Sequence, residues 1–120
     1  MLVTITLLAL IATSISFFPY EWGPRFLPAG FRCWRAGIAC AAAIAPLFWL
    51  LLRRGVTLNP IRSGATAGFL AGIFGLTVLT IECNYLDSLH LTIWHLGAVL
   101  TTMLIGAGIG HFARARQRNF

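Results

Sequence analysis

Four apolar stretches occupy most of this 120-residue chain, and its nine basic residues, all of them arginines, gather near the ends of those stretches. The stretches run over residues 1–18, 31–52, 64–81 and 91–112. A helix needs roughly 20 residues to cross the ~30 Å hydrocarbon core of a bilayer, and each stretch is close to that length. Because a bilayer offers no water to unpaired backbone groups, each stretch is expected to be helical. We predict an all-α integral membrane four-helix bundle that forms one transmembrane domain.

The low content of charge supports the same class. Hydrophobic residues make up 58% of the chain and charged residues only 10%, whereas charged residues are about 25% of a soluble domain. A formal net charge of +6 would indicate nucleic-acid binding in a soluble chain. Near membrane helices, arginines more often set the topology and touch anionic lipid. We therefore expect the lipid bilayer as a partner and no direct contact with nucleic acid.

The distribution of the arginines predicts the orientation. Arg53, Arg54 and Arg62 follow the second stretch, and three more arginines lie in the C-terminal tail. On the other side, Cys83–His90 contains none, and the first connection and the start of the second stretch contain three, Arg25, Arg32 and Arg35. Short connections rich in Lys and Arg stay in the cytoplasm. Both termini and the middle connection are therefore predicted to be cytoplasmic, with Cys83–His90 outside. The expected location is the inner membrane of a bacterium, as a multi-pass protein.

Proline and polar residues predict the boundaries of the helices. Pro19, Pro24 and Pro28 predict a loop over residues 17–30, because proline lacks an N–H group and interrupts helices. Ser63 is expected to be the N-cap of the third helix.

Small residues recur at helical spacing in the third and fourth apolar stretches. A spacing of four returns to one face of a helix, where small side chains let two helices approach closely in lipid. We predict that this face places the third helix at the centre of the bundle. A homodimer interface is the alternative, because the pattern does not identify the partner helix. The packing residues are Gly64, Gly68, Gly72, Gly75, Gly106 and Gly110.

The unusual polar side chains fall at one depth when the helices are folded as antiparallel neighbours. Cys33 lies near the start of the second helix and Cys83 at the end of the third, both on the predicted outer side. We define the outer rim as these two cysteines together with the polar and aromatic residues at the same depth. Those residues are Arg32, Arg35, Glu82, Asp87, His90, Trp94 and His95.

The two cysteines of the outer rim admit more than one role. Cysteines on neighbouring helices can form a thiol switch that is oxidised or binds a soft metal, or they can be small apolar packing residues. A metal site made of Cys83, His90 and His95 is a weaker alternative. The ligand spacing is not a standard one, and histidines five residues apart diverge on an α-helix.

Ion pairing is the expected role of the remaining charges. Ionisable residues at a membrane boundary usually pair with one another, so Glu82 is expected to pair with Arg32 or Arg35. A hydrogen bond from His95 to Glu82 is also expected. No nucleophile has a base and an orienting acid at useful spacing, and no phosphate-binding glycine loop follows a strand. We therefore expect no enzyme activity, no catalytic residue and no cofactor.

A set of spaced motifs runs through the last two apolar stretches and the connections before them. The motifs are Arg53-Arg54-Gly55, Asn59-Pro60, the spaced glycines from Gly64 to Gly75, Glu82-Cys83, Leu86, Asp87, His90, Trp94-His95-Leu96-Gly97, Gly106 and Gly110. This set resembles a known family, the NrsF-type negative regulators of extracytoplasmic-function sigma factors. The resemblance covers about residues 19–114 and is most specific over residues 52–110. Asn84 stands where the family commonly has Pro.

This resemblance implies a role in transcription regulation. Members look like six-helix inner-membrane proteins that hold a sigma factor until a signal arrives at the outer face. The chain is similar to the last four of those helices, so we expect it to be the transmembrane, sensory part of such an anti-sigma factor, in a truncated form, with the sigma factor as partner. The alternative is a small membrane subunit of a redox or metal-handling complex, with Cys83, His90 and His95 as ligands.

Overall fold

A computed structural model describes residues 2–17, 23–54, 59–84 and 87–119 of the chain. These residues are almost entirely helical, and none of them forms a β-strand. The predicted all-α class is confirmed. The helices are α1 (Leu2–Phe17), α2 (Phe26–Arg54), α3 (Pro60–Glu82) and a continuous last helix composed of α4 (Ser88–His90), the π-helical turn η1 (Leu91–His95) and α5 (Leu96–Arg118).

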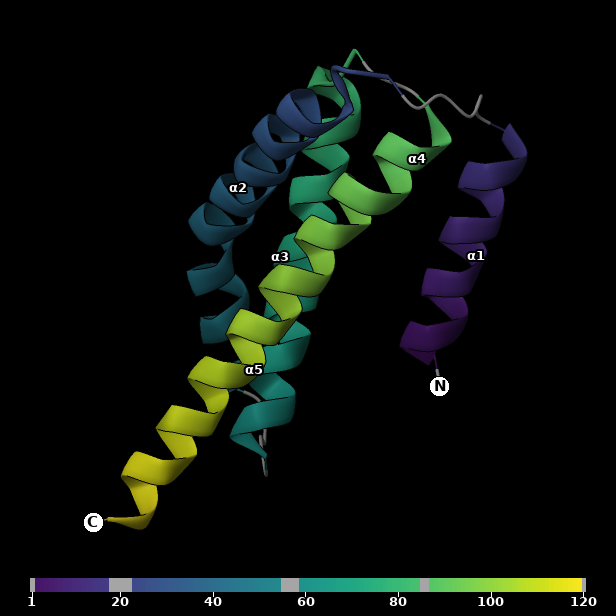
Figure 1. Ribbon diagram of the computed structural model, residues 1–120. Helices are drawn as coiled ribbons and strands as arrows, with labels where there is room; N and C mark the ends of the chain where they lie inside the picture. The colour runs from purple at the N-terminus through teal and green to yellow at the C-terminus, as the bar shows by residue number, and fades with distance from the viewer. Residues whose placement is uncertain (1, 18–22, 55–58, 85–86, 120) are drawn as a thin grey trace.

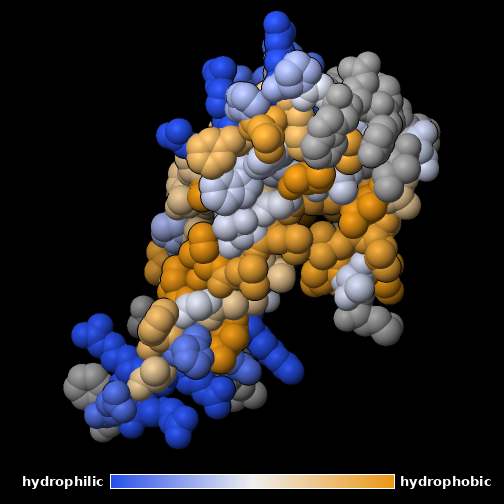
Figure 2. Space-filling model, in the orientation of Figure 1, coloured by the Kyte–Doolittle hydropathy of each residue, from blue (hydrophilic) through white to orange (hydrophobic). Residues whose placement is uncertain are grey.

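Three of these helices are long and apolar enough to cross a membrane, namely α2, α3 and the run from Ser88 to Arg118, and α1 is a shorter apolar helix. The long helices pack side by side, with α3 in contact with both α2 and α5 (Figure 1). The helix α1 stands apart from this bundle and contacts it mainly at α4 and η1. Hydrophilic residues gather at the two ends of the bundle, and a hydrophobic band lies between them (Figure 2).

Helix α2 begins at Phe26, earlier than predicted. The Phe26 N–H donates to the Gly23 carbonyl and the Ala29 N–H to the Arg25 carbonyl, both at 3.0 Å. Pro28 lies in the first turn, where the backbone N–H would have no partner within the helix, so a proline there costs no hydrogen bond. The predicted loop was therefore too long at its C-terminal end. Pro19 lies outside the described residues.

Helix α3 also begins earlier than predicted, because its N-cap is Asn59 rather than Ser63. The Asn59 side chain accepts a hydrogen bond from the Ile61 N–H at 3.1 Å. Pro60 follows at the first helical position, where its fixed φ angle suits the helix. Ser63 lies inside the helix and donates its hydroxyl to the Asn59 carbonyl at 3.2 Å. The sequence Asn59-Pro60 is thus the start of the helix.

The glycines of α3 set its distance from α5. A Cβ atom at Gly64 would collide with the carbonyl oxygen of Gly106, and one at Gly68 would collide with that of Thr102. These obstacles are backbone atoms, which cannot rotate away as a flexible side chain can. The two helices therefore touch backbone to backbone, which is the close approach that small residues permit in lipid.

The same stripe of glycines also brings α2 against α3. A Cβ atom at Gly75 would lie 2.6 Å from the carbonyl oxygen of Gly37 in α2. The predicted packing glycines therefore contact other helices of the same chain, and α3 lies at the centre as predicted. Homodimer formation stays a prediction. Of the predicted set, the buried ones are Gly64, Gly68, Gly72, Gly75 and Gly110.

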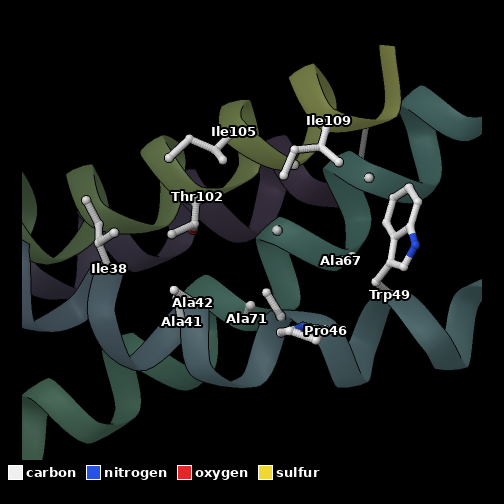
Figure 3. A pocket seen from close by; sticks show the side chains of 14 residues that line it. Ile38, Ala41, Ala42, Pro46, Trp49, Ala67, Ala71, Thr102, Ile105 and Ile109 are labelled. Atoms are coloured by element: carbon white, nitrogen blue, oxygen red, sulfur yellow. The ribbon is translucent and has the colours of Figure 1, made fainter. Parts of the chain in front are cut away.

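A cavity of about 430 Å³ lies between α2, α3 and α5, beside the part of α3 that runs from Gly64 to Ala71 (Figure 3). Small residues such as Ala41, Ala67 and Ala71 line it, together with Pro46 and Ile105. Almost no polar atom faces it, so it is a place for apolar groups rather than for water-bound chemistry.

We expect Gly68→Leu to destabilise the protein, because the added side chain would collide with the backbone of α5. Overpacking typically costs about 1–3 kcal/mol, and immovable backbone places this variant at the upper end. Gly108→Leu is the matched control, since nothing lies within 4 Å of a Cβ atom at Gly108. The melting temperature in detergent micelles and the amount of protein in membranes are measured for both variants. Equal melting of Gly68→Leu and the parent would show that the interface between α3 and α5 is wrong.

Candidate functional site

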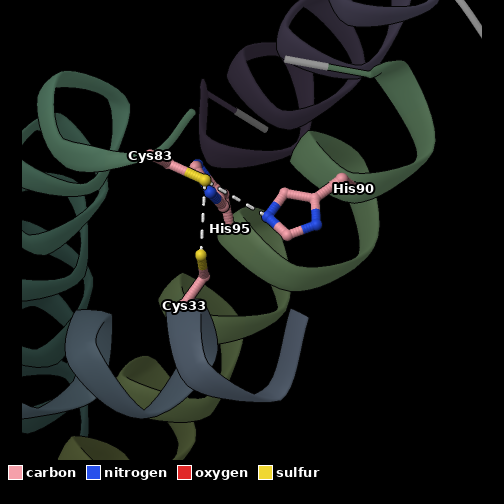
Figure 4. A group of neighbouring side chains, drawn as sticks. All are labelled: Cys33, Cys83, His90 and His95. Atoms are coloured by element: carbon pink, nitrogen blue, oxygen red, sulfur yellow. Dashed lines mark hydrogen bonds between the residues drawn. The ribbon is translucent and has the colours of Figure 1, made fainter. Parts of the chain in front are cut away.

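Four side chains of metal-ligating types, contributed by three segments, meet at one end of the bundle. The Cys33 Sγ atom lies 3.3 Å from the Cys83 Sγ atom, which lies 3.4 Å from His90 Nε2 (Figure 4). His95 completes the group, and the ligand atoms of the four residues all lie within 4.8 Å of one another. We call Cys33, Cys83, His90 and His95 the Cys-His cluster.

The approach of the two cysteines follows from the packing of α2 on α3. Cys83 directly follows α3, and its N–H donates to the Leu79 carbonyl at 2.8 Å. Cys33 lies inside α2, one turn before Gly37, the residue that Gly75 of α3 contacts. Backbone contact at that level holds the two helices closely enough for both thiols to meet. The structure thus places together the two residues proposed as a thiol switch.

The convergence of the two histidines depends on the π-helical turn η1. The Leu96 N–H donates to the Leu91 carbonyl, a step of five residues. Residues five apart diverge by about 140° on an α-helix, but backbone bonds of this longer step bring them to nearly one face. The rings of His90 and His95 accordingly have centroids 5.3 Å apart and an interplanar angle of 72°. The prediction that they diverge is wrong because it assumed an α-helix throughout.

His95 is buried in an unusual way. Its side chain is 1% exposed, and neither ring nitrogen has a hydrogen-bond partner among the described residues. The expected hydrogen bond to Glu82 is therefore not formed. Leaving a buried polar group unpaired costs about 1–3 kcal/mol, so this imidazole calls for a partner that protein atoms of the described chain do not supply.

Asp87 orients the start of the last helix. Its carboxylate oxygen Oδ2 accepts a hydrogen bond from the backbone N–H of His90 at 3.0 Å, as the N-cap of α4. The adjacent Ser88 and His90 are buried, at 2% and 1% exposure. Asp87 of the outer rim therefore fixes the position of His90 rather than standing apart in solvent.

The expected ion pairs are not formed within the described part of the chain. Glu82 and Arg32 are both exposed, and they line one cavity of about 520 Å³ beside the cysteines without pairing. The guanidinium carbon of Arg35 instead lies 5.8 Å from the centre of the Phe31 ring, in reach of a cation–π interaction. Exposed ion pairs gain little in water because both groups stay hydrated, which explains why these charges stand apart.

Aromatic side chains pack where α2 meets the last helix, and Gly30 makes room for one of them. Trp94 packs on Phe26, with ring centroids 5.8 Å apart, and its indole occupies the space that a Cβ atom of Gly30 would take. Trp34 donates its Nε1–H group to the Thr101 hydroxyl at 3.3 Å. Sequence reasoning missed the part played by Gly30. Its spacing of seven from Gly37, about two helical turns, is the signal that marks this face of α2.

Comparison with known proteins identifies the family. The family model described as NrsF, negative regulator of sigma F, matches residues 1–113. The match begins at residue 1 rather than near residue 19, so the predicted extent of the resemblance was too small and α1 belongs to the matched region. No curated protein and no solved structure matches the chain. With nearly its whole length matched, the chain belongs to the NrsF family of negative regulators of sigma F.

Proposed function

We propose that this chain is the transmembrane, signal-receiving part of an anti-sigma factor, which retains an extracytoplasmic-function sigma factor at the bacterial inner membrane. Membership of the family supplies the negative regulation of a sigma factor. The observation that supports the sensory role is the short distance between the Cys33 and Cys83 sulfur atoms at one end of the bundle. The thiols of two helices in contact form a site where a chemical signal can alter the bundle.

The charge distribution supports an outer location for that site. At the opposite end, the last residue of α2 is Arg54, α3 carries Arg62 in its first turn, and α5 ends at Arg118. Arginine-rich ends of membrane helices stay in the cytoplasm. With this orientation both chain termini face the cytoplasm, where a sigma factor resides, and the Cys-His cluster faces outward.

The packing of α2 on α3 supports transmission of a signal from the Cys-His cluster to the opposite end of the bundle. Oxidation of Cys33 and Cys83 by a peroxide would join the sulfurs, which give up two electrons and two protons while the peroxide is reduced to water. The sulfurs would have to approach by about 1.3 Å, because a disulfide bond is about 2.0 Å long. Since α2 and α3 touch through the backbone at Gly37 and Gly75, any part of this shift that the side chains do not absorb would be passed to the helices.

We expect labelling of single cysteines to show the proposed orientation. In a background without native cysteines, Asn84→Cys should react with a membrane-impermeant maleimide in intact spheroplasts. Asn59→Cys should react only after the membrane is permeabilised, because the arginine-rich connection lies inside. Reaction of Asn59→Cys in intact spheroplasts would refute the orientation, and full reaction of both variants in detergent controls for accessibility.

We expect the native protein, tagged at its chromosomal locus, to co-purify a sigma factor from unstressed cells. Mild peroxide should lower the amount of bound sigma factor at least ~10-fold, equivalent to about 1.4 kcal/mol of coupling free energy. Cys33→Ser and Cys83→Ser should abolish this response, whereas Cys40→Ser, on the same helix, should respond like the parent. Sigma release that persists in both serine variants would contradict a sensory role of the thiols, and absence of any sigma factor would contradict the anti-sigma role.

A further inference from the structure

We propose that the Cys-His cluster is a tetrahedral site for a metal ion of the zinc class, in which His90 and His95 complete the ligand set begun by Cys33 and Cys83. This site goes beyond the regulatory role proposed above and does not depend on it. The argument rests on four observations: the distances, the ligand types, the orphaned imidazole of His95 and the access from the surface.

The distances are close to those of a tetrahedral zinc site. With Zn–S bonds of about 2.3 Å and Zn–N bonds of about 2.0–2.1 Å, the ligand atoms of a tetrahedron lie about 3.3–3.8 Å apart. The sulfur atoms of Cys33 and Cys83 are 3.3 Å apart, and Cys83 Sγ is 3.4 Å from His90 Nε2. All four ligand atoms lie within 4.8 Å of one another. Only small movements would therefore bring them onto one ion.

The ligand types select the ion. Two cysteines with two histidines make one of the common structural zinc sites. When the ion binds, each thiol releases its proton, so two thiolates balance the charge of a divalent cation and the loaded site is neutral. A neutral site suits the end of an apolar helix bundle, where net charge is costly. Mg²⁺ and Ca²⁺ are disfavoured because they require oxygen ligands, which the set lacks.

A bound ion would explain two unusual features of the last helix. The buried His95 ring has no hydrogen-bond partner for either nitrogen in the described chain, and a metal ion would satisfy one of them. The π-helical turn over Leu91–His95 is a rare conformation that occurs frequently at functional sites. Here it places His95 beside His90, an arrangement that an α-helix would not allow.

Two cavities reach residues of the cluster from the surface. The cavity of about 520 Å³ is lined by both cysteines and by Glu82, whose carboxylate attracts cations, although Arg25 and Arg32 also line it. A second cavity, of about 270 Å³, reaches His90 past Asp87 and Arg25. These openings provide an entry path for an ion, which a metal site requires.

The chain offers matched controls for this proposal. Cys40 lies two turns from Cys33 on α2, and His111 is exposed near the end of α5. Neither belongs to the cluster. Substitution of either residue removes the same chemical group as substitution of a proposed ligand, so a difference in binding between the two sets reports the site rather than the number of thiols or imidazoles.

The test uses the full chain in lipid nanodiscs, kept reduced with a phosphine, and Co²⁺ followed by Zn²⁺ as probes. We expect one ion per chain, with the visible absorption of tetrahedral Co²⁺ and a sulfur-to-cobalt charge-transfer band, both removed by Zn²⁺. His90→Gln and His95→Gln should each weaken Zn²⁺ binding by at least ~10-fold. Cys40→Ser and His111→Gln should bind like the parent.

X-ray absorption of the Zn²⁺-loaded parent provides a measurement that needs no variant. Two sulfur and two nitrogen ligands support the proposal, and this result decides the matter if a histidine variant does not fold. A parent that binds neither ion, a site with sulfur but fewer than two nitrogen ligands, or folded histidine variants with unchanged affinity would overturn it. Sigma release is measured separately in cells, so failure of the metal site and failure of the regulatory role are distinguishable.

Discussion

Contact between the backbones of α3 and its two neighbours is the constraint on which the rest of the structure depends. Gly64 and Gly68 let α3 touch α5, and Gly75 lets it touch Gly37 of α2. Between apolar helices in lipid there is little hydrophobic drive, and close packing of this kind is what holds such helices together. The same contacts set the spacing at which side chains from separate helices meet at the polar end of the bundle.

The second constraint is the π-helical turn at the start of the last helix. It rotates the helix so that His90 and His95 share a face, and it leaves His95 buried among groups that do not bond to its nitrogens. Asp87 anchors the three residues before this turn, Ser88–His90, as the N-cap of α4. The tight packing of α3 and the π-helical turn of the last helix thus determine one small cluster of side chains, in a family defined by negative regulation of a sigma factor.

Sequence reasoning predicted local features well and their partners less well. The helices, the central position of α3 and the shared depth of Cys33 and Cys83 follow from hydropathy and spacing. The start of α2 was misplaced because a proline in a first turn costs nothing there. The pairing of Glu82 with an arginine was wrong because exposed charges remain hydrated, a property that depends on burial rather than on residue type.

The sequence by itself determined that this protein consists of apolar helices with arginine-rich ends, because length, hydropathy and charge are properties of each segment alone. Only the tertiary structure decided that Cys33, Cys83, His90 and His95 form one cluster. That meeting depends on how each helix is rotated about its axis and on one extra residue in a single helical turn. Neither is encoded in a hydrophobic period, since both arise from the fit of one helix surface against another.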